Sequence, residues 1–283
     1  MTYLLLYLLA LSLFTHAMHF AQRRDGDLLV ILPINYVIAA VTSIALVYTE
    51  GGAIPWKNTL VMSLGIINGV IFFVHLLFIL ESFKIAGTGI TVTLVQSGCI
   101  LPVLFAHLVW PQTETMSAMQ WTALAIVPFC VILMRPECIQ SPHLALKHDF
   151  ILLVSFLGVG ITFSIHKVVE ANTNADGQIG YQAVLFTAAM VSSVAYAFVR
   201  RKRPTRLDSL AGVLGGALNT ATLRTLMLAL DSLGAVRVYL ISGPSLVVIN
   251  IIVGLIVWKD KITRRQMLGV LIAFVVVTLT CLG

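Results

Sequence analysis

The sequence predicts an all-α membrane protein in which ten transmembrane helices form two inverted repeats of five helices each. Three observations lead to this prediction. The composition is too apolar for a soluble chain, ten apolar segments have the length of a membrane span, and a set of motifs recurs in the same order in both halves.

The composition identifies lipid as the solvent of this chain. Of the 283 residues, 59% are hydrophobic and 11% are charged, and the mean hydropathy is +0.98. Soluble domains carry about 25% charged residues, because they need polar surface to face water. We therefore expect an integral, multi-pass membrane protein in contact with the lipid bilayer.

The net charge of +6 does not indicate a nucleic-acid partner. The basic residues form short clusters between apolar runs, as between Arg200 and Arg206, and such clusters are typical of cytoplasmic loops. The four cysteines form no CxxC pair, so we expect neither a zinc site nor a disulfide framework. No cofactor is predicted.

Ten segments are long enough to cross a bilayer core of about 30 Å. They are residues 3–20, 28–49, 59–80, 88–110, 118–134, 149–168, 179–199, 207–230, 235–258 and 265–282. Cap and helix-stop residues separate them, among them Asp27, Gly51, Asn58, Asp208 and Asp231. The first segment lacks a basic region and a cleavage site, which favours a retained span over a signal peptide.

An internal repeat relates residues 1–138 to residues 139–283. Four pairs of motifs correspond in order: Leu64-Gly65 and Asn68 with Gly215-Gly216 and Asn219, Glu81-Ser82 with Asp231-Ser232, Ser97-Gly98 with Ser242-Gly243, and Glu114 to Gln120 with Asp260 to Gln266. Because each half has an odd number of spans, the second copy enters the membrane from the opposite side. Transporters use such inverted repeats, with the substrate site near the midplane.

The distribution of basic residues predicts the orientation. Loops after odd-numbered spans hold fourteen Lys or Arg residues, whereas loops after even-numbered spans hold three. The positive-inside rule therefore places the odd-numbered loops in the cytoplasm and both termini outside.

The second half also carries motifs of a known family. The run from Ala229 to Ala235, then Pro244, Trp258 to Thr263, Gln266 and Gly269, resembles the second repeat of EamA-type members of the drug/metabolite transporter superfamily. Pro102, Glu114 and Gln120 repeat the pattern in the first half, while Lys259-Asp260 replaces the usual Gly-Glu.

This resemblance implies a secondary transporter or exporter of small organic metabolites that works by alternating access, with a cavity lined by both halves. It also implies cytoplasmic termini, opposite to the charge distribution, and a bacterial inner membrane. The alternative is an ion channel or divalent-cation permease that uses intramembrane histidines. No catalytic motif is present, so an enzyme is not expected. The oligomeric state stays open between monomer and homodimer.

Arg224 is the sharpest candidate for substrate binding. It lies about two turns inside the end of the eighth segment, where a charge is costly unless it faces a cavity or a partner. One interpretation is an anion-binding guanidinium for a carboxylate or phosphate of the substrate. The other is a snorkelling arginine, or one paired with Asp231 or a helix end.

Asn68 and Asn219 occupy matching positions in the two repeats, beside the GxxxG spacings of Gly65 with Gly69 and Gly212 with Gly216. Such spacings allow helices to approach closely. The two amides bind substrate across the pseudo-two-fold axis, or they only pack the bundle; packing is the favoured interpretation.

Histidines supply much of the remaining polarity within the spans. His19 lies one turn after His16, His75 lies on the same face as Asn68, and His166 lies near the end of the sixth span. Histidine can carry a coupling proton or bind a metal. Since no carboxylate completes a metal site, packing is the favoured role.

Prolines mark two further candidates. Gln96 precedes Pro102 in the fourth span, and Tyr239 precedes Pro244 in the ninth. Proline frees a backbone carbonyl one turn earlier, which kinks the helix or offers a ligand to a substrate. The weaker candidates on similar grounds are Asn35, Tyr36 and Asn250.

Overall fold

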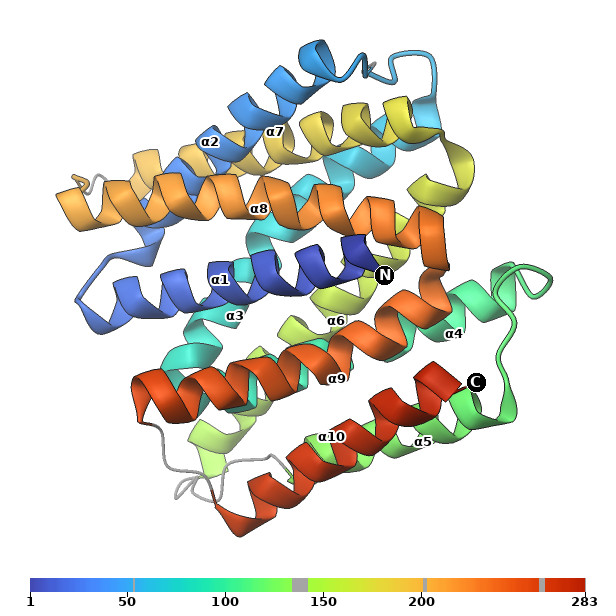
Figure 1. Ribbon diagram of the computed structural model, residues 1–283. Coiled ribbons are helices and arrows are strands. Elements are labelled where there is room, and N and C mark those ends of the chain that lie inside the picture. The colour runs from blue at the N-terminus through green and yellow to red at the C-terminus, as the bar shows by residue number, and fades with distance from the viewer. Residues whose placement is uncertain (53, 134–141, 201–202, 260–262, 283) are drawn as a thin grey trace. The chain divides into compact units, whose positions relative to one another are not determined.

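The computed structural model is all-helical in the part of the chain that it describes, which is residues 1–283 except 53, 134–141, 201–202, 260–262 and 283 (Figure 1). The ten α-helices of the described residues are α1 (Thr2–Arg23), α2 (Leu28–Thr49), α3 (Thr59–Ser97), α4 (Ile100–Val109), α5 (Ala118–Leu133), α6 (Pro142–Asn172), α7 (Ala175–Arg200), α8 (Arg206–Leu233), α9 (Ala235–Val253) and α10 (Arg264–Leu282). A π-helical turn, Gly254–Trp258, extends α9.

Seven of these helices are long and apolar enough to cross a membrane. The candidate spans are Thr2–Arg23, Leu28–Thr49, Thr59–Ser82, Phe150–Asn172, Ala175–Phe198, Arg206–Leu233 and Ala235–Trp258. The shorter apolar helices are Ile100–Val109, Ala118–Phe129 and Met267–Val276. The chain is therefore an integral, multi-pass membrane protein, as the composition predicts.

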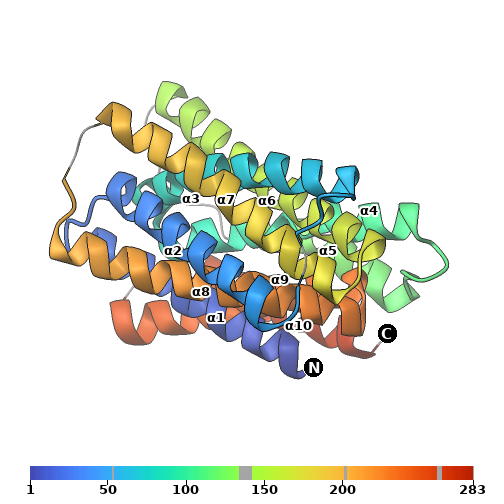
Figure 2. The ribbon, with the colours of Figure 1, turned by 90° about the horizontal axis from the view of Figure 1, so that it is seen from above.

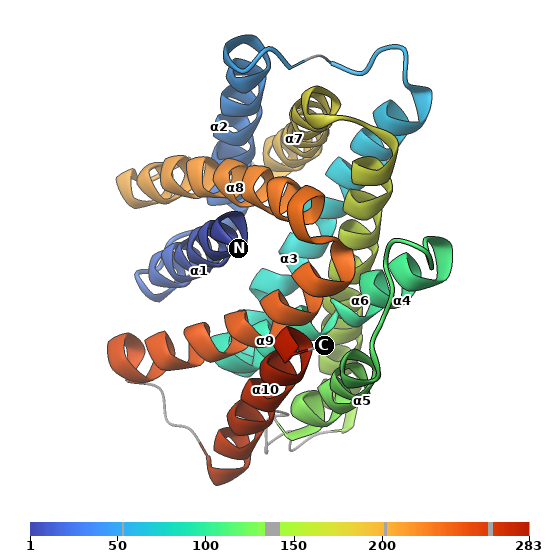
Figure 3. The same cartoon turned by 45° about the vertical axis from the view of Figure 1, so that its right-hand side comes forward.

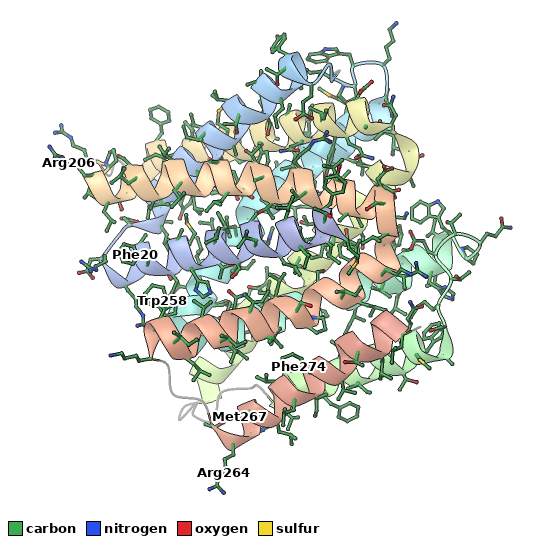
Figure 4. All side chains as sticks on the ribbon, in the orientation of Figure 1. Phe20, Arg206, Trp258, Arg264, Met267 and Phe274 are labelled. Atoms are coloured by element: carbon green, nitrogen blue, oxygen red, sulfur yellow. The ribbon has the colours of Figure 1, made fainter. Side chains whose placement is uncertain are left out.

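Many large apolar side chains point away from the protein. Met267 and Phe274 on α10 are half exposed and project outward from the ribbon (Figure 4). On α8, Leu210 and Leu214 are similarly exposed. Water would make such a surface unfavourable, whereas hydrocarbon solvates it, so these faces are the ones that contact lipid.

The predicted turn between the third and fourth spans is wrong. The helix α3 runs without interruption from Thr59 to Ser97, through the Glu81-Ser82 motif. The hydroxyl of Ser82 donates to the carbonyl of Phe78 at 2.8 Å, which satisfies this polar side chain within the helix. A pair of polar residues therefore does not end a helix whose next residues can continue it.

A break occurs instead at Gly98-Cys99, one turn before Pro102. Pro102 has no N–H for the carbonyl of Gly98, and the chain tightens locally, with the Leu101 amide donating to that carbonyl at 3.1 Å. The helical run therefore breaks between α3 and α4 just before this proline. Pro244, its predicted counterpart, lies inside the continuous helix α9.

Two helix starts carry reciprocal caps. Thr205 and Asp208 exchange hydrogen bonds at the start of α8, with the Thr205 amide donating to Asp208 Oδ2 at 2.9 Å. Ser117 and Gln120 do the same at the start of α5, at 2.9 and 3.1 Å. Each pair satisfies amide groups that the helix itself leaves without acceptors.

The contacts divide the chain into two compact units. Unit 1 comprises residues 1–74 and 165–232, and unit 2 comprises residues 75–164 and 233–283. The helices α3 and α6 contribute to both units, and each unit contains segments of both predicted repeats. This division concerns packing, so the repeat boundary near residue 138 stays a prediction.

In unit 1, α2 packs along α7 and α8 (Figures 1 and 2). Residue numbers rise in the same direction along both helices at the contacts of α8 with α2: Gly212 lies against Ile34, Gly216 against Ile38, and Thr220 against Thr42. The two helices therefore run parallel. Because glycine has no side chain, Gly212 and Gly216 bring α8 close to α2, as the GxxxG spacing predicts.

In unit 2, α10 lies beside α5 and α9 (Figure 3). Its core joins Ala123 and Val127 of α5 with Val248 of α9 and Val276 of α10. These side chains are all apolar. The residues of this unit that the sequence predicts for substrate binding lie outside this core.

Candidate functional site

Two groups of buried polar side chains connect the apolar spans of unit 1. The first joins α3, α7 and α6 through Asn68, Tyr181 and His166, which are all fully buried. Asn68 Nδ2 donates to the hydroxyl of Tyr181 at 2.6 Å, and that hydroxyl lies 3.0 Å from Nδ1 of His166. Oδ1 of Asn68 has no hydrogen-bond partner among the described residues.

The tyrosine hydroxyl connects the other two side chains. Its oxygen accepts a hydrogen bond from Asn68 Nδ2 and shares a second one with Nδ1 of His166, in which the tautomer of the imidazole decides which group donates. The three side chains form a continuous chain of hydrogen bonds in the apolar interior.

Close packing of α3 on α7 holds this chain in place. A side chain at Gly69 would overlap the backbone oxygen of Leu185, and a Cβ at Gly65 would lie 2.8 Å from Val184. Only glycine permits this approach, and it brings the amide of Asn68 within reach of Tyr181. The packing interpretation of this GxxxG spacing is thus supported by the structure.

The second group lies between α2, α7 and α8. The hydroxyls of Thr42 and Thr220 are 2.7 Å apart, and Gln182 Nε2 donates to the carbonyl of Thr220 at 3.0 Å. Tyr36 on α2 donates to the carbonyl of Phe72 on α3 at 3.1 Å. These bonds connect neighbouring helices and leave few of their own polar atoms unsatisfied.

Two amides beside this group differ from it. Asn35 is fully buried, and neither its Nδ2 nor its Oδ1 has a partner in the described part of the chain. Asn219, one turn after Gly215 on α8, is also buried, and its Nδ2 has no partner among the described residues. Asn35 appeared in the sequence only as a weaker candidate, because a lone asparagine carries no motif.

The structure pairs Arg224 with Glu50 and not with Asp231, the partner considered in the sequence. Its Nη2 donates to Oε2 of Glu50 at 2.7 Å, which joins the C-terminal part of α8 to the end of α2. The other nitrogen, Nη1, is buried without a partner among the described residues. The guanidinium is therefore partly neutralised by a carboxylate that the sequence did not indicate as its partner.

The remaining candidates are distributed between the units. His19 is buried on α1, next to Met18, which is also buried. His75 is buried on the part of α3 in unit 2, where Gly158 of α6 faces its Cβ. Gln96 lies in α3, and its side chain is outside the described residues. Residues 134–141 and 260–262, with the predicted motif at Asp260, also lie outside them.

Tyr239 of unit 2 is fully buried on α9. Its ring stacks on Phe163 of α6 with centroids 5.0 Å apart, and its hydroxyl donates to the carbonyl of Phe163 at 3.0 Å. The hydroxyl of Ser242, one turn further, is buried without a partner among the described residues. The structure thus satisfies the polar end of Tyr239 with a neighbouring helix.

Glu114 has a role that its sequence position did not reveal. Its carboxylate accepts from the amides of Ala235 at 2.9 Å and Val236 at 3.0 Å, at the start of α9. A carboxylate at a helix N-terminus is favourable because it meets free N–H groups and the positive end of the helix dipole. Gly234 precedes this start with a φ of 78°. A polar pocket of about 380 Å³ adjoins Glu114 within unit 2.

The described histidines do not converge on a metal site. Among the residues that it describes, no group of three His, Cys, Asp or Glu side chains could hold a metal ion. The described hydrogen bond of His166 goes to a tyrosine.

Comparisons with known proteins establish the fold. A crystal structure of a protein matches with a TM-score of 0.74 over 99% of this chain and 98% of that chain, at 14% sequence identity. In total, 27 chains of solved structures match. No protein-family model matches the sequence, and no curated protein matches it.

Proposed function

We propose that this protein is a secondary transporter that moves a small organic metabolite across the membrane by alternating access between two inverted five-helix repeats, as in EamA-type transporters. The observation that carries the proposal is a set of buried amide atoms in the apolar spans of unit 1 that have no hydrogen-bond partner among the described residues: both polar atoms of Asn35, Oδ1 of Asn68 and Nδ2 of Asn219.

The energetics of polar groups in lipid support this proposal. A buried polar group that lacks a hydrogen bond costs about 1–3 kcal/mol in proteins. Helices that cross a membrane rarely carry such groups unless they pair with one another or border a path for a solute. Asn68 can satisfy only part of its amide through Tyr181, and Asn35 satisfies neither polar atom among the described residues. A passing solute with polar groups would complete these bonds.

The histidine-based cation pathway has less support. The described bonds of His166 belong to the chain with Tyr181 and Asn68, and the described residues offer no group of metal ligands. A channel also predicts ionic current that does not depend on any organic solute.

The proposal is tested by solute efflux from reconstituted vesicles. Vesicles with the purified protein are loaded with a defined mixture of metabolites, and the retained solutes are measured by mass spectrometry over time. We expect the protein to deplete a small subset of solutes faster than protein-free vesicles do. The Asn68→Leu variant should slow that efflux, whereas Leu214→Ala, on the exposed face of α8, should not.

Two results would overturn the proposal. One is efflux of every solute at the rate of protein-free vesicles. The other is a steady ionic current through the protein in planar bilayers without any solute present.

A further inference from the structure

We infer that the amides of Asn35 and Asn219 form a binding site for an uncharged, hydrogen-bonding solute where α1, α2 and α8 meet in unit 1. This inference rests on the proposed transport function and adds the chemical class of the substrate. It assigns Arg224 a structural role in place of anion binding.

The position of Asn35 is defined by its neighbours. Its Oδ1 lies 3.2 Å from the point where a Cβ of Gly215 would be, and the side chains of Met18 and Phe14 of α1 approach the same point. The amide therefore lies at the junction of three helices, beside a glycine that lets the flexible Met18 side chain and Asn35 approach the same point. No described side chain there supplies a donor or an acceptor for it.

Asn219 adds a second amide on the same side of α8. It follows Gly215 by four residues, which places it about 6 Å further along the helix on the same face. Its Nδ2 is buried and unpartnered among the described residues. The two asparagines thus offer unsatisfied donors and an acceptor within the reach of one small molecule.

Other polar side chains close to this pair find partners on neighbouring helices. Gln182, an amide of similar size on α7, donates to the carbonyl of Thr220 at 3.0 Å. Thr42 and Thr220 satisfy each other at 2.7 Å. The helices can therefore satisfy polar side chains in this region, yet those of Asn35 and Asn219 remain available.

The charge pairs inside the spans of unit 1 disfavour an anion as the ligand of this site. Arg224 is bound by Glu50, Lys167 by Glu170 at 2.6 Å, and Asp208 by its capping bonds with Thr205. An anionic solute would have to displace Glu50 from Arg224 and would be repelled by that carboxylate. A carboxamide, in contrast, offers both a donor and an acceptor and favours neutral amides, nucleobases and hydroxylated solutes.

The test compares neutral solutes with anionic counterparts of nearly the same shape. The detergent-solubilised protein is screened by thermal unfolding against a metabolite library that includes nicotinamide and nicotinate, uridine and uridine monophosphate, and glucose and glucose 6-phosphate. A ligand that binds only the folded protein raises the unfolding temperature. The same screen is run on Asn35→Leu, Asn219→Leu, Gln182→Leu and Arg224→Gln.

We expect neutral members to raise the unfolding temperature by several degrees and their anionic counterparts to raise it little. Asn35→Leu and Asn219→Leu should unfold at or above the wild-type temperature, because an unpartnered amide is replaced by an apolar group, and they should lose the ligand-induced shift. Gln182→Leu should unfold at a lower temperature and keep the shift, since its amide serves the fold.

Two outcomes would overturn the inference. One is stabilisation by anionic members that disappears in Arg224→Gln, and the other is a library in which no neutral compound stabilises the protein through Asn35. The vesicle assay separates this failure from failure of the transport proposal. A neutral solute that binds without being moved contradicts transport, whereas anions that are moved contradict the neutral site.

Discussion

Arg224 and Glu50 form an ion pair that connects α8 to the C-terminal end of α2, with Nη2 of the arginine 2.7 Å from Oε2 of the glutamate. The pair continues the parallel contacts of these helices, which include the hydrogen bond from the Asp27 amide to Asp208 Oδ1 near their N-terminal ends. The arginine that stands out most in the sequence thus contributes to the association of two helices.

Exchanging the two charges tests this role. In Arg224→Glu and in Glu50→Arg, two like charges meet, and each variant should lose about 1 kcal/mol of unfolding free energy, since Glu50 is partly exposed. The double variant Arg224→Glu/Glu50→Arg should recover most of the loss. Denaturant unfolding in detergent micelles measures all four proteins. A double variant no more stable than the worse single variant would refute the pairing.

The Tyr181 hydroxyl is predicted to stabilise the interior of unit 1. In Tyr181→Phe, the amide of Asn68 loses its acceptor and Nδ1 of His166 loses its hydrogen-bond partner. Hydrogen bonds between membrane helices contribute about 0.6–2 kcal/mol each, so we expect a loss of roughly 1–3 kcal/mol. Tyr48→Phe is the control, because Tyr48 is 82% exposed. Equal unfolding free energies for the two variants would contradict the hydrogen-bond chain.

Because α3 and α7 approach closely at Gly69, substitutions at residues 69 and 70 should differ sharply in their cost to the unfolding free energy. A methyl group at position 69 meets the backbone oxygen of Leu185, which cannot move without displacing α7. Gly69→Ala should therefore cost about 1–3 kcal/mol by overpacking. Val70→Ala, next to it on an exposed face, should cost well below 1 kcal/mol. Unfolding in detergent measures both, and a harmless Gly69→Ala would show that the helices are further apart.

Comparing Gly234, in the turn before α9, with Gly51 separates the cost of backbone strain from the cost of steric overlap. Gly51 and Gly234 have similar φ values of 72° and 78°. A Cβ at Gly51 meets nothing within 4 Å, whereas a Cβ at Gly234 lies 3.1 Å from Oε2 of Glu114. Gly51→Ala therefore measures the cost of the left-handed conformation alone, about 1 kcal/mol. Gly234→Ala should cost more than this.

A double variant identifies the source of the additional cost. In a Glu114→Ala background the carboxylate is gone, so adding Gly234→Ala should cost only as much as Gly51→Ala does. Thermal or denaturant unfolding provides the comparison. If the cost of Gly234→Ala is the same with and without Glu114, the carboxylate does not approach this turn.

The sequence predicts most helix limits where a cap residue accompanies a change in polarity. The predicted limits of α2, residues 28–49, agree with the structure, because Asp27 accepts from the Leu29 amide at 3.0 Å and Gly51 follows the last turn. The continuity of α3 through Glu81 was not predicted. Polarity alone separates apolar runs, but a helix ends only where the backbone needs a new partner or conformation.

The candidate site shows a similar limit. Asn68 is visible in the sequence as a polar residue among apolar ones, whereas its partner Tyr181, close to the start of α7, carries no comparable signal. The partner of Arg224 is 174 residues away in the chain. Local spacing suggested Asp231, but pairing depends on how α2 and α8 pack. Sequence patterns identify which side chains are costly in lipid, and packing decides which of them are satisfied.

Counterflow in reconstituted vesicles tests the central claim of solute transport by alternating access most directly. Vesicles are loaded with a high concentration of an unlabelled neutral solute that stabilises the protein, and a trace of the labelled solute is added outside. A carrier predicts transient accumulation of label above its outside concentration, and Asn35→Leu should abolish it. Label that only equilibrates, with or without solute inside, would contradict a carrier and indicate a pore.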